Sequence, residues 1–288
     1  RRPEGTGSAF LLNGIASPGA AGYSAQPGSC LRTGATMGRL RVPATRGGTF
    51  QVRGFTALSF GSPVAPSAKR GGRTVTATRE ASLERDRMVA GEIAARGVED
   101  PLVLEAMRAV PREDFVPADL AEYAYEDGPL PIGHGQTISQ PYIVAVMIAA
   151  ARVRPGDRVL EIGAGSGYGA AVLSEIAAEV YTVERIEALA DSARDRLAAL
   201  GYGNVHVRCG DGTLGWAEHA PYDAIIVTAG GPTVPRALLD QLKPGGRLVM
   251  PLGSEPRAQR LVRRTRTGPG ACTQDDLEWV AFVSLIGE

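Results

Sequence analysis

Residues 158–185 contain two apolar runs that flank a glycine-rich turn. The first run, RVLEIG, leads directly into AGSGYG, and a helix-like stretch then connects to the second run, EVYTVE. Runs of Val, Ile and Leu separated by a helix are typical of parallel strands buried on both faces. The segment therefore predicts a strand–helix–strand unit of an α/β sheet.

The same alternation continues towards the C-terminus. Strands are predicted at 158–163, 179–184, 205–210, 222–229 and 247–253, with helices over 168–178 and 186–200 between the early ones. Two later runs, 259–267 and 277–286, are typical of antiparallel strands that close a sheet. The pattern predicts a doubly wound, mostly parallel sheet of the Rossmann-like type.

Short helices are predicted ahead of the sheet. Ser82 can cap a helix over 83–97 that ends at Gly97, and Asp100 can cap a second helix over 101–110. The apolar face of the first helix would carry Leu83, Met88 and Ile93.

A loop region and one more helix follow. Pro and Gly mark 112–140 as loops. The stretch PYIVAVMIAAARV, 141–153, is apolar on every face, which predicts a buried helix.

Residues 1–80 differ from the rest of the chain in composition. They are rich in Gly, Ala, Ser, Thr and Arg, and up to Arg79 they hold eleven Lys or Arg residues and one acid. Such a segment buries too little apolar surface to offset its ordering entropy, so we predict a disordered extension followed by a folded domain over 81–288. The extension fits a transit-type peptide, a natural low-complexity tail or upstream sequence absent from the mature protein, and we favour a dispensable tail.

The charge of the folded part limits its partners. From Glu80 onward the chain carries 20 bases and 30 acids, a net charge of −10, which argues against a nucleic-acid-binding face. The chain has no run of eighteen apolar residues, so we expect no membrane span. Cys30, Cys209 and Cys272 show no metal-binding spacing, so we expect no metal and a reducing compartment. We expect a cytoplasmic monomer, or an organellar one if the extension is a transit peptide.

The glycine-rich turn indicates which ligand the sheet binds. Gly163, Gly165 and Gly167 let the backbone turn sharply and approach a ligand closely. A dinucleotide fingerprint would space them as GxGxxG, but here the spacing is GxGxG and the acid Glu161 precedes the turn. A carboxylate there suits a cationic ligand better than a pyrophosphate. The pattern therefore predicts a site for S-adenosyl-L-methionine, with S-adenosyl-L-homocysteine as the product.

Two further acids lie at the ends of the next two predicted strands, at the edge of the sheet where the cofactor would bind. Glu184 ends the second strand, where a carboxylate can accept both ribose hydroxyls, and Asp211 follows the third, where an adenine amino group could be met. Ser166 and Gly212 complete the predicted cofactor-binding set. Each feature also has a structural reading, in which the glycines form a packing turn, Glu161 is an ion partner and Asp211 is a turn residue.

With these residues, the chain from about Arg87 to Leu285 resembles protein-L-isoaspartate (D-aspartate) O-methyltransferases. The most specific segment is PLPIGHGQTISQPYIVAVM, 129–147, which belongs to substrate binding in that family. The other segments that carry the resemblance are VLEAMRAVPREDFVP (103–117), VLEIGAGSGYGAAVL (159–173), VYTVERI (180–186), GDGTLGWAEHAPYDAIIVTAG (210–230) and QLKPGGRLVMPLG (241–253). The resemblance implies a Rossmann-like class I S-adenosylmethionine-dependent methyltransferase domain.

The resemblance also implies a protein-repair activity. The family methylates the α-carboxylate of L-isoaspartyl, and often D-aspartyl, residues in damaged proteins and peptides. The ester then closes to a succinimide, which reopens partly to normal aspartate. By position, Ser139 matches the family's active-site serine, within the block that holds the isoaspartyl carboxylate: Thr137, Ile138, Ser139 and Gln140.

The chemistry of methyl transfer makes that role reasonable. A carboxylate acceptor with a pKa of about 3.9 is ionised at neutral pH and needs no general base. Catalysis then depends on alignment and desolvation, and a hydroxyl can orient a carboxylate without neutralising it. Bases are scarce between Glu113 and Ala151, which agrees with this. From the residues alone, Ser139 could instead cap the helix that follows, and the two roles are compatible.

The chain departs from the family pattern at two places. The usual Arg-His before the phenylalanine of RHxFVP is Arg112-Glu113 here, and the closing FVPL reads FVSL, with Ser284 in place of proline. Because the family's C-terminal strand region contributes to substrate contact, these departures bear on the acceptor range.

Other polar residues are expected to have ordinary roles. We expect His134 to be solvated, His206 and Cys209 to pack on the third strand, and Trp216 and His219 to be cofactor-side or structural. We also expect an edge strand to carry a basic run that forms a solvated face: Arg263, Arg264 and Arg266.

Three hypotheses of function follow. The leading one is isoaspartyl O-methyltransfer in protein repair. The second is a tailoring O-methyltransferase that acts on an aspartate of one modified peptide, for which the altered C-terminus leaves room. The third is a non-catalytic S-adenosylmethionine-binding module, against which the intact block 137–140 argues. A nucleic-acid methyltransferase is disfavoured because the fourth strand ends in TAGGP, not in an Asn-Pro-Pro-aromatic clamp.

Overall fold

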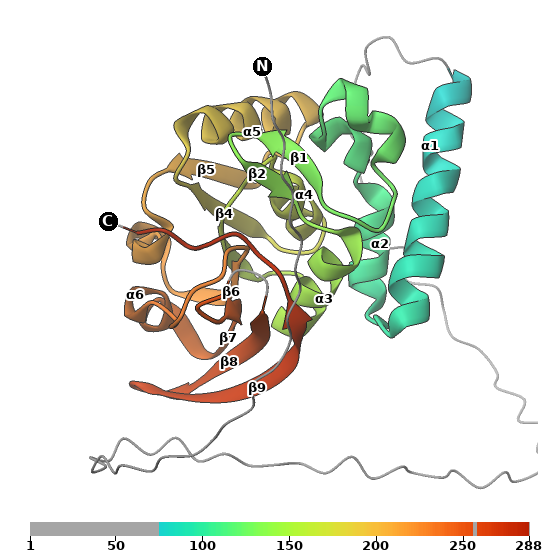
Figure 1. Cartoon of the computed structure of the whole chain (residues 1–288). Helices are drawn as coiled ribbons and strands as arrows, with labels where there is room; N and C mark the ends of the chain where they lie inside the picture. Colours follow the sequence, from blue (N-terminus) through green and yellow to red (C-terminus); the bar gives the residue numbers. More distant parts are fainter. Residues whose placement is uncertain (1–74, 256–257, 288) are drawn as a thin grey trace, which may run out of the picture. The chain divides into compact units, whose positions relative to one another are not determined.

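A computed structural model describes residues 75–255 and 258–287 of the chain. Its centre is a seven-stranded sheet of order β5-β4-β3-β6-β7-β8-β9 (Figure 1). The strands are β3 (Arg158–Ile162), β4 (Glu179–Glu184), β5 (Val205–Cys209), β6 (Tyr222–Val227), β7 (Leu242–Leu252), β8 (Gln259–Gly268) and β9 (Ala271–Val280). Neighbours from β5 to β7 pair in parallel, and β8 and β9 pair antiparallel. The predicted Rossmann-like, mostly parallel sheet is confirmed.

Helices precede the sheet and lie between its strands. The main ones are α1 (Val75–Arg87), α2 (Pro101–Ala109), α3 (Pro141–Ala151), α4 (Tyr168–Ser174), α5 (Glu187–Leu200) and α6 (Arg236–Asp240). A π-helical turn (Met88–Ile93) and a 3₁₀ turn (Ala94–Arg96) extend α1, and further 3₁₀ turns lie at Arg112–Phe115, Ala118–Tyr123, Gly212–Leu214 and Ala217–His219.

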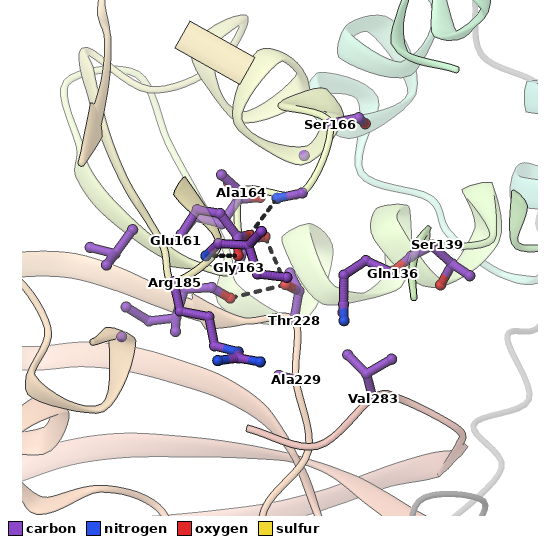
Figure 2. Close-up of a pocket in the computed structure, with 18 of the residues that line it drawn as sticks. Gln136, Ser139, Glu161, Gly163, Ala164, Ser166, Arg185, Thr228, Ala229 and Val283 are labelled. Carbon is purple, nitrogen blue, oxygen red and sulfur yellow. Dashed lines mark hydrogen bonds between the residues drawn. The ribbon is translucent and has the colours of Figure 1, made fainter. Parts of the chain in front are cut away.

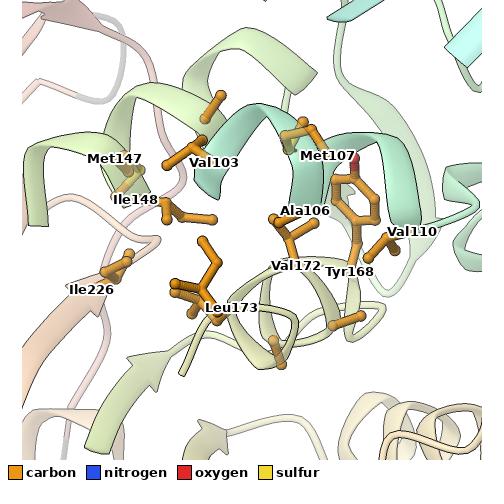
Figure 3. Packing of buried hydrophobic residues seen from close by; sticks show 14 of the residues in the cluster. Val103, Ala106, Met107, Val110, Met147, Ile148, Tyr168, Val172, Leu173 and Ile226 are labelled. Carbon is orange, nitrogen blue, oxygen red and sulfur yellow. Dashed lines mark hydrogen bonds between the residues drawn. The ribbon is translucent and has the colours of Figure 1, made fainter. Parts of the chain in front are cut away.

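Both faces of the central strands β3, β4 and β6 are buried. Along β3 the side chains alternate: Val159 belongs to the larger core cluster, whereas Leu160 and Ile162 belong to a second cluster that includes Leu238 of α6. In the larger cluster α2 and α3 pack against α4 and β6 (Figure 3). Its buried members include Val103, Ala106, Met107, Met147, Ile148, Val172, Leu173 and Ile226. This packing fixes α3 and α4, whose first residues border the candidate site.

The chain changes direction within the sheet at β3. β4 and β5 lie on one side of it, and β6 and the later strands lie on the other. Glu161 of β3 pairs with Thr182 of β4 and with Ile226 of β6, so the carboxyl ends of the three strands are level. Open α/β sheets bind their ligands at such a switch point.

The helical predictions are confirmed for α2 and α3 and are partly wrong for α1. Asp100 caps α2 by accepting a hydrogen bond from the Leu102 amide at 3.1 Å. Ser82 lies inside α1 and therefore does not cap it. Leu83 is 50% exposed, whereas Met88 and Ile93 are buried. Residues five apart share a face in a π-helix but not in an α-helix, so the π-helical turn groups only the last two.

The region expected to be loops contains a small hairpin. Strands β1 (Leu130–Gly133) and β2 (Gln136–Ile138) pair antiparallel, and exposed His134 lies in their turn with a φ of 52°. Strands this short leave no clear alternation in a sequence rich in Gly and Pro, so the pattern predicted only loops.

The edges of the sheet differ from the prediction. β9 spans Ala271–Val280 instead of 277–286, and β8 lies between β7 and β9, so the basic run is not on an edge strand. Arg263 forms an ion pair with Asp275 of β9 at 2.9 Å. β5 is the other edge. Its Cys209 is exposed and not packed as predicted, whereas His206, although exposed, does pack, because its ring stacks on the Tyr181 ring with the centroids 4.8 Å apart. An apolar run cannot by itself reveal which strand lies outermost.

Candidate active site

One pocket opens at the carboxyl ends of β3, β4 and β6 (Figure 2). Residues from two parts of the chain face each other across it. We call the first part the cofactor half: Glu161–Ser166, Tyr168, Gly169, Val183–Ile186, Gly212, Thr228 and Ala229. We call the second part the acceptor half: Gln136–Ser139, Val144 and Val283–Ile286. In Figure 2, Ser139 and Gln136 lie on one side, Gly163 and Glu161 on the other, and Val283 below Ser139.

The glycine turn of the cofactor half is held by Thr228. The Thr228 hydroxyl lies 2.9 Å from the carbonyl oxygens of both Ile162 and Gly163. Gly163 has a φ of 96°, and a Cβ atom there would lie 2.3 Å from the Thr228 Oγ1 atom. A side chain at this position is therefore excluded by its backbone conformation and by the close contact. The turn leaves the backbone open to the pocket.

Glu161 is a buried carboxyl group in the wall of the pocket. It is 2% exposed, and its Oε2 atom accepts a hydrogen bond from the Thr182 hydroxyl at 2.7 Å. Burial raises the pKa of Glu161 to about 8; the charge of Glu184 adds to the rise and the Thr182 hydrogen bond opposes it. A buried carboxyl with one donor is stabilised as a carboxylate when a cation enters the pocket. This fits the predicted cationic ligand.

Glu184 braces the same turn from β4. Its Oε2 atom accepts a hydrogen bond from the Gly165 amide at 2.9 Å, and its Oε1 atom accepts one from the Ile186 amide at 3.0 Å. Each carboxylate oxygen can accept more than one hydrogen bond, and Glu184 lines the pocket. The geometry therefore suits a carboxylate that receives the two hydroxyls of a ribose.

The remaining predicted cofactor residues divide into two groups. Ser166 and Gly212 line the pocket, and the Ser166 carbonyl is held by the Arg196 guanidinium at 2.8 Å. Gly167 and Asp211 do not line it. Gly167 precedes α4 as its N-cap, and Asp211 caps a 3₁₀ turn by accepting hydrogen bonds from the Thr213 amide and hydroxyl at 2.8 and 2.7 Å.

Of the predicted acceptor residues, some line the pocket and one does not. Thr137, Ile138 and Ser139 line the pocket. Gln140 does not line it, and its side-chain amide donates to Asp127 instead. Gln140, not Ser139, is the N-cap residue of α3, so the reading of Ser139 as a helix cap is wrong. The Ser139 side chain is left to face the pocket.

The last residues of the chain form a strap that the sequence pattern did not predict. Residues 283–286 line the pocket after β9 has ended, and in Figure 1 this red segment runs back past the end of β6. Gly230 holds the strap from both sides: its amide donates to the Val283 carbonyl at 2.8 Å, and its carbonyl accepts from the Leu285 amide at 2.7 Å. Arg185, Thr228 and Ala229 are further lining residues missing from the predicted set.

The two departures from the family pattern lie in different surroundings. Glu113 is buried and does not line the pocket; it accepts a hydrogen bond from the Tyr125 hydroxyl. Ser284 lies in the strap and lines the pocket. The substitution at Ser284 is therefore the one that can act on a bound acceptor.

The aromatic residues after β5 have packing roles. The His219 ring stacks on the Tyr181 ring with their centroids 4.1 Å apart, and the Trp216 ring meets both of these rings edge-on. Neither Trp216 nor His219 lines the pocket, so of the two roles expected for them the structural one fits. Within residues 75–255 and 258–287, no cluster of His, Cys, Asp and Glu could hold a metal ion.

A parallel sheet with this glycine turn, a buried acid before it and a second acid at the end of the next strand defines a Rossmann-like class I S-adenosylmethionine-dependent methyltransferase. A sequence model of one methyltransferase family, protein-L-isoaspartate(D-aspartate) O-methyltransferase, matches residues 83–288. The chain belongs to this family.

Individual relatives agree with that assignment. Protein-L-isoaspartate O-methyltransferase 1 of Rhodopseudomonas palustris is 63% identical over 207 residues, which cover 72% of this chain and 84% of the relative. Protein-L-isoaspartate O-methyltransferase 2 of Pelobacter propionicus is 57% identical over 209 residues, covering 73% and 93%.

Solved structures of the same family are also similar. One protein-L-isoaspartate O-methyltransferase superposes with a TM-score of 0.64 and 32% identity, covering 70% of this chain and 66% of that one. A β-aspartate methyltransferase from Plasmodium falciparum, solved with S-adenosyl-L-homocysteine, gives a TM-score of 0.61 at 26% identity, covering 70% and 98%. Among the helices that the structure describes, none is long and apolar enough to cross a membrane.

Proposed function

We propose that this chain transfers a methyl group from S-adenosyl-L-methionine to the α-carboxylate of L-isoaspartyl residues in damaged proteins. One observation carries the proposal: the segment Gln136–Ser139 and the turn Glu161–Ser166 line the same pocket from opposite sides. A methyl donor held by the turn and a carboxylate held by the segment would therefore meet inside one cavity. The product ester would then close to a succinimide away from the enzyme, which begins repair.

The cofactor half fits the donor by charge and shape. S-adenosyl-L-methionine, when bound, supplies a methyl group activated by a sulfonium. Glu161 would face the cationic end of the ligand, Glu184 would accept the ribose hydroxyls, and the backbone of Gly163–Ser166 would lie against it. Gly212 lines the wall at the end of the third strand, and Asp211 would act through the turn that it caps.

The acceptor half fits a carboxylate that must stay nucleophilic. Its lining residues include hydroxyl and amide groups but no Lys or Arg. In this arrangement the Ser139 hydroxyl, with Thr137 beside it, donates to one carboxylate oxygen while the other oxygen attacks the methyl group. The new oxygen–carbon bond forms as the sulfur–carbon bond breaks, and no proton has to move because the acceptor is already ionised.

Replacing Ser139 tests this role. We expect Ser139→Ala to lower kcat/KM for an isoaspartyl peptide by about tenfold or more, because one hydrogen bond to a charged group is lost. The Kd for S-adenosyl-L-methionine, measured by calorimetry, should stay unchanged. Ser192→Ala, at an exposed position on α5, is the control and should behave as wild type. Wild-type turnover by Ser139→Ala would contradict the proposed role.

The proposal also covers the oligomeric state, the compartment and the bounds of the catalytic domain. We infer a monomeric cytoplasmic enzyme whose catalytic domain spans 81–288 and which does not bind nucleic acid, from the acidic charge of that part of the chain. Residues 1–74 lie outside the described residues, and α1 begins at Val75. Light scattering coupled to gel filtration would test the oligomeric state, since a dimer mass would contradict it.

A second candidate function changes only the acceptor. A tailoring methyltransferase would use the same cofactor half but act on an aspartate of one modified peptide. Ser284 in the pocket wall is the observation that favours it, because a hydroxyl there changes the acceptor half alone.

A further inference from the structure

The start of α3 is held from outside the pocket by three residues, which we call the Arg96–Asp127–Gln140 brace. The Gln140 side-chain amide donates to the Asp127 Oδ2 atom at 2.5 Å and to the Asp127 main-chain carbonyl at 3.2 Å. The Arg96 Nη1 atom donates to the same Oδ2 atom at 2.6 Å. Asp127 thus joins the end of the first helical region to the residue that caps α3.

Arg96 also contacts α3 directly. Its guanidinium lies 3.4 Å from the centroid of the Tyr142 ring, on the second residue of the helix. Such a stacked cation adds attraction beyond the ion pair. Arg96 therefore fixes α3 on two sides, through Asp127 at Gln140 and by stacking at Tyr142.

Other charged groups act on the residues of the brace. Glu278 of β9 acts electrostatically on Arg96, and Asp127 acts on buried Arg112. Asp127 is the group on which the Arg96 and Arg112 charges both act, and its side chain is 19% exposed. The carboxylate is accordingly needed as a charge as well as an acceptor.

The brace sets the backbone on one side of Ser139. On the other side, Ile138 of β2 is buried and pairs with Leu130 of β1. Within the part of the chain that the structure describes, the Ser139 hydroxyl has no hydrogen-bond partner. Its direction therefore depends on the two segments that flank it: Ile138 is held by burial in the core cluster, and Gln140 by the hydrogen bonds of its side chain to Asp127.

We propose that Arg96 and Asp127 are positioning residues for the acceptor: they hold Gln140 and Tyr142 so that the Ser139 hydroxyl points at the acceptor carboxylate. The inference rests on the proposed function, since it needs Ser139 to contact that carboxylate. Neither Arg96 nor Asp127 lines the pocket, so both act through the start of α3. The brace reaches the cofactor half only indirectly, since Asp127 acts on Arg112, whose guanidinium lies over the Tyr168 ring, and we therefore expect donor binding to change little.

The first test is Asp127→Asn in the full chain. The amide keeps the shape and one oxygen, which could still accept from both Gln140 and Arg96 as Oδ2 does, but it removes the negative charge that holds Arg96 and that acts on buried Arg112. We expect kcat/KM for an isoaspartyl peptide to fall about tenfold to a hundredfold, as for a small misplacement of a reacting group. The Kd for S-adenosyl-L-methionine should change less than about twofold, which a general loss of structure would not permit.

Asp100→Asn is the matched control. Asp100 forms an ion pair with Arg154 at 2.6 Å, and its side chain is 15% exposed, close to the value for Asp127. This pair lies at the opposite end of α3, and the remaining oxygen of the amide can still cap α2. We expect wild-type acceptor kinetics. An equal loss in both variants would overturn the inference, because the effect would then be one of stability.

Arg96 supplies a second test that does not remove a half-buried carboxylate. Its side chain is 41% exposed, so Arg96→Gln should fold. We expect the same loss of acceptor kcat/KM in Arg96→Gln and partial recovery in Arg96→Lys, which keeps the charge but loses the planar stack on Tyr142. Wild-type kinetics of Arg96→Lys would count against the stack, and equal losses in the Gln and Lys variants would count against the ion pair.

Ser139→Ala, measured in the same assay, separates the two proposals. If Ser139→Ala is impaired while Asp127→Asn and Arg96→Gln match wild type, the brace is overturned and the proposed function stands. If Ser139→Ala itself matches wild type, the role proposed for Ser139 fails and the inference fails with it, while isoaspartyl methylation by both proteins still supports the proposed function. If wild type itself does not methylate the isoaspartyl peptide, the proposed function fails.

Discussion

The two halves of the pocket are built in different ways. The cofactor half consists mainly of consecutive residues at the ends of adjacent strands, and its contacts join near neighbours in the sheet, such as Glu161 with Thr182. The acceptor half brings together a hairpin, the start of α3 and a strap at the other end of the chain. The first half is fixed by the sheet itself, whereas the second depends on contacts between segments that lie outside the parallel strands.

This difference predicts which property of the enzyme a substitution in each half would alter. Substitutions in the cofactor half should remove binding of the methyl donor and with it all activity. Substitutions around the acceptor half should leave the donor bound and alter only which carboxylate is methylated, or how fast.

The largest loss of donor affinity is expected from Gly163→Ala, which distorts the glycine turn of the cofactor half. A Cβ atom would lie 2.3 Å from Thr228 Oγ1, so the turn must shift. We expect the affinity for S-adenosyl-L-methionine to fall by about a hundredfold or more, at a cost of roughly 1–3 kcal/mol for the strained backbone together with the lost contacts. Titration calorimetry measures this directly.

Gly201→Ala controls for the backbone strain alone. Gly201 has a φ of 88°, but nothing lies within 4 Å of the position a Cβ would take. It should lose stability and keep its affinity for the donor. Similar affinities in the two variants would show that the close contact with Thr228 does not matter.

Glu161 makes the cofactor half sensitive to pH. Its pKa of about 8 means that the carboxyl is neutral below that pH in the free protein, and a cationic donor favours the ionised form. The Kd should therefore fall with rising pH, by at most about tenfold per unit, until pH 8. Glu161→Gln should bind weakly and should lack this part of the pH dependence, since any remaining slope then belongs to the ligand. A wild-type slope in Glu161→Gln would contradict the assignment.

The same carboxyl affects stability with a defined sign. A folded-state pKa raised from 4.5 to about 8 stabilises the neutral form, so its contribution is present below pH 4.5 and is lost as pH rises through 8. The Tm of the wild type without ligand should fall relative to that of Glu161→Gln between pH 5 and pH 8. Parallel Tm curves would show that Glu161 is not buried as described.

Smaller effects are expected from the strap, which belongs to the acceptor half. Leu285→Pro removes the amide that donates to the Gly230 carbonyl, so the acceptor KM should rise several-fold while donor affinity is kept. Ser284→Pro restores the usual family residue without removing either hydrogen bond to Gly230, and we expect a change of less than about threefold. Steady-state kinetics on one isoaspartyl peptide compare them. A larger effect from Ser284→Pro would indicate that the serine contacts the acceptor.

The sequence predicts the cofactor half better than the acceptor half. Glu161, Gly163, Gly165 and Glu184 could be found from spacing because a strand–turn–helix unit is local, and all four line the pocket. The elevated pKa of Glu161 could not be found, since it arises from burial by α4 and the neighbouring strands. Ser139 could be singled out only through the resemblance to a family.

The rest of the acceptor half had no local signal. The run LEWVAFVSLI is apolar almost throughout, and nothing in it marks that β9 ends at Val280 and that the strap begins beyond it. Arg96 and Asp127 belong to segments predicted as a helix end and a loop, and their ion pair depends on how these pack. Asp211 is predicted as a ligand residue because it follows a strand, and the spacing could not show that its side chain caps a turn and lies outside the pocket lining.

The specificity of the enzyme for isoaspartyl residues is tested with two peptides that differ only in one linkage. Methyl transfer from labelled S-adenosyl-L-methionine is measured on an isoaspartyl peptide and on its ordinary aspartyl twin, at equal concentration and with saturating donor. The two halves described here predict label in the isoaspartyl peptide alone. Equal labelling of both peptides, or of neither, would contradict an isoaspartyl repair enzyme.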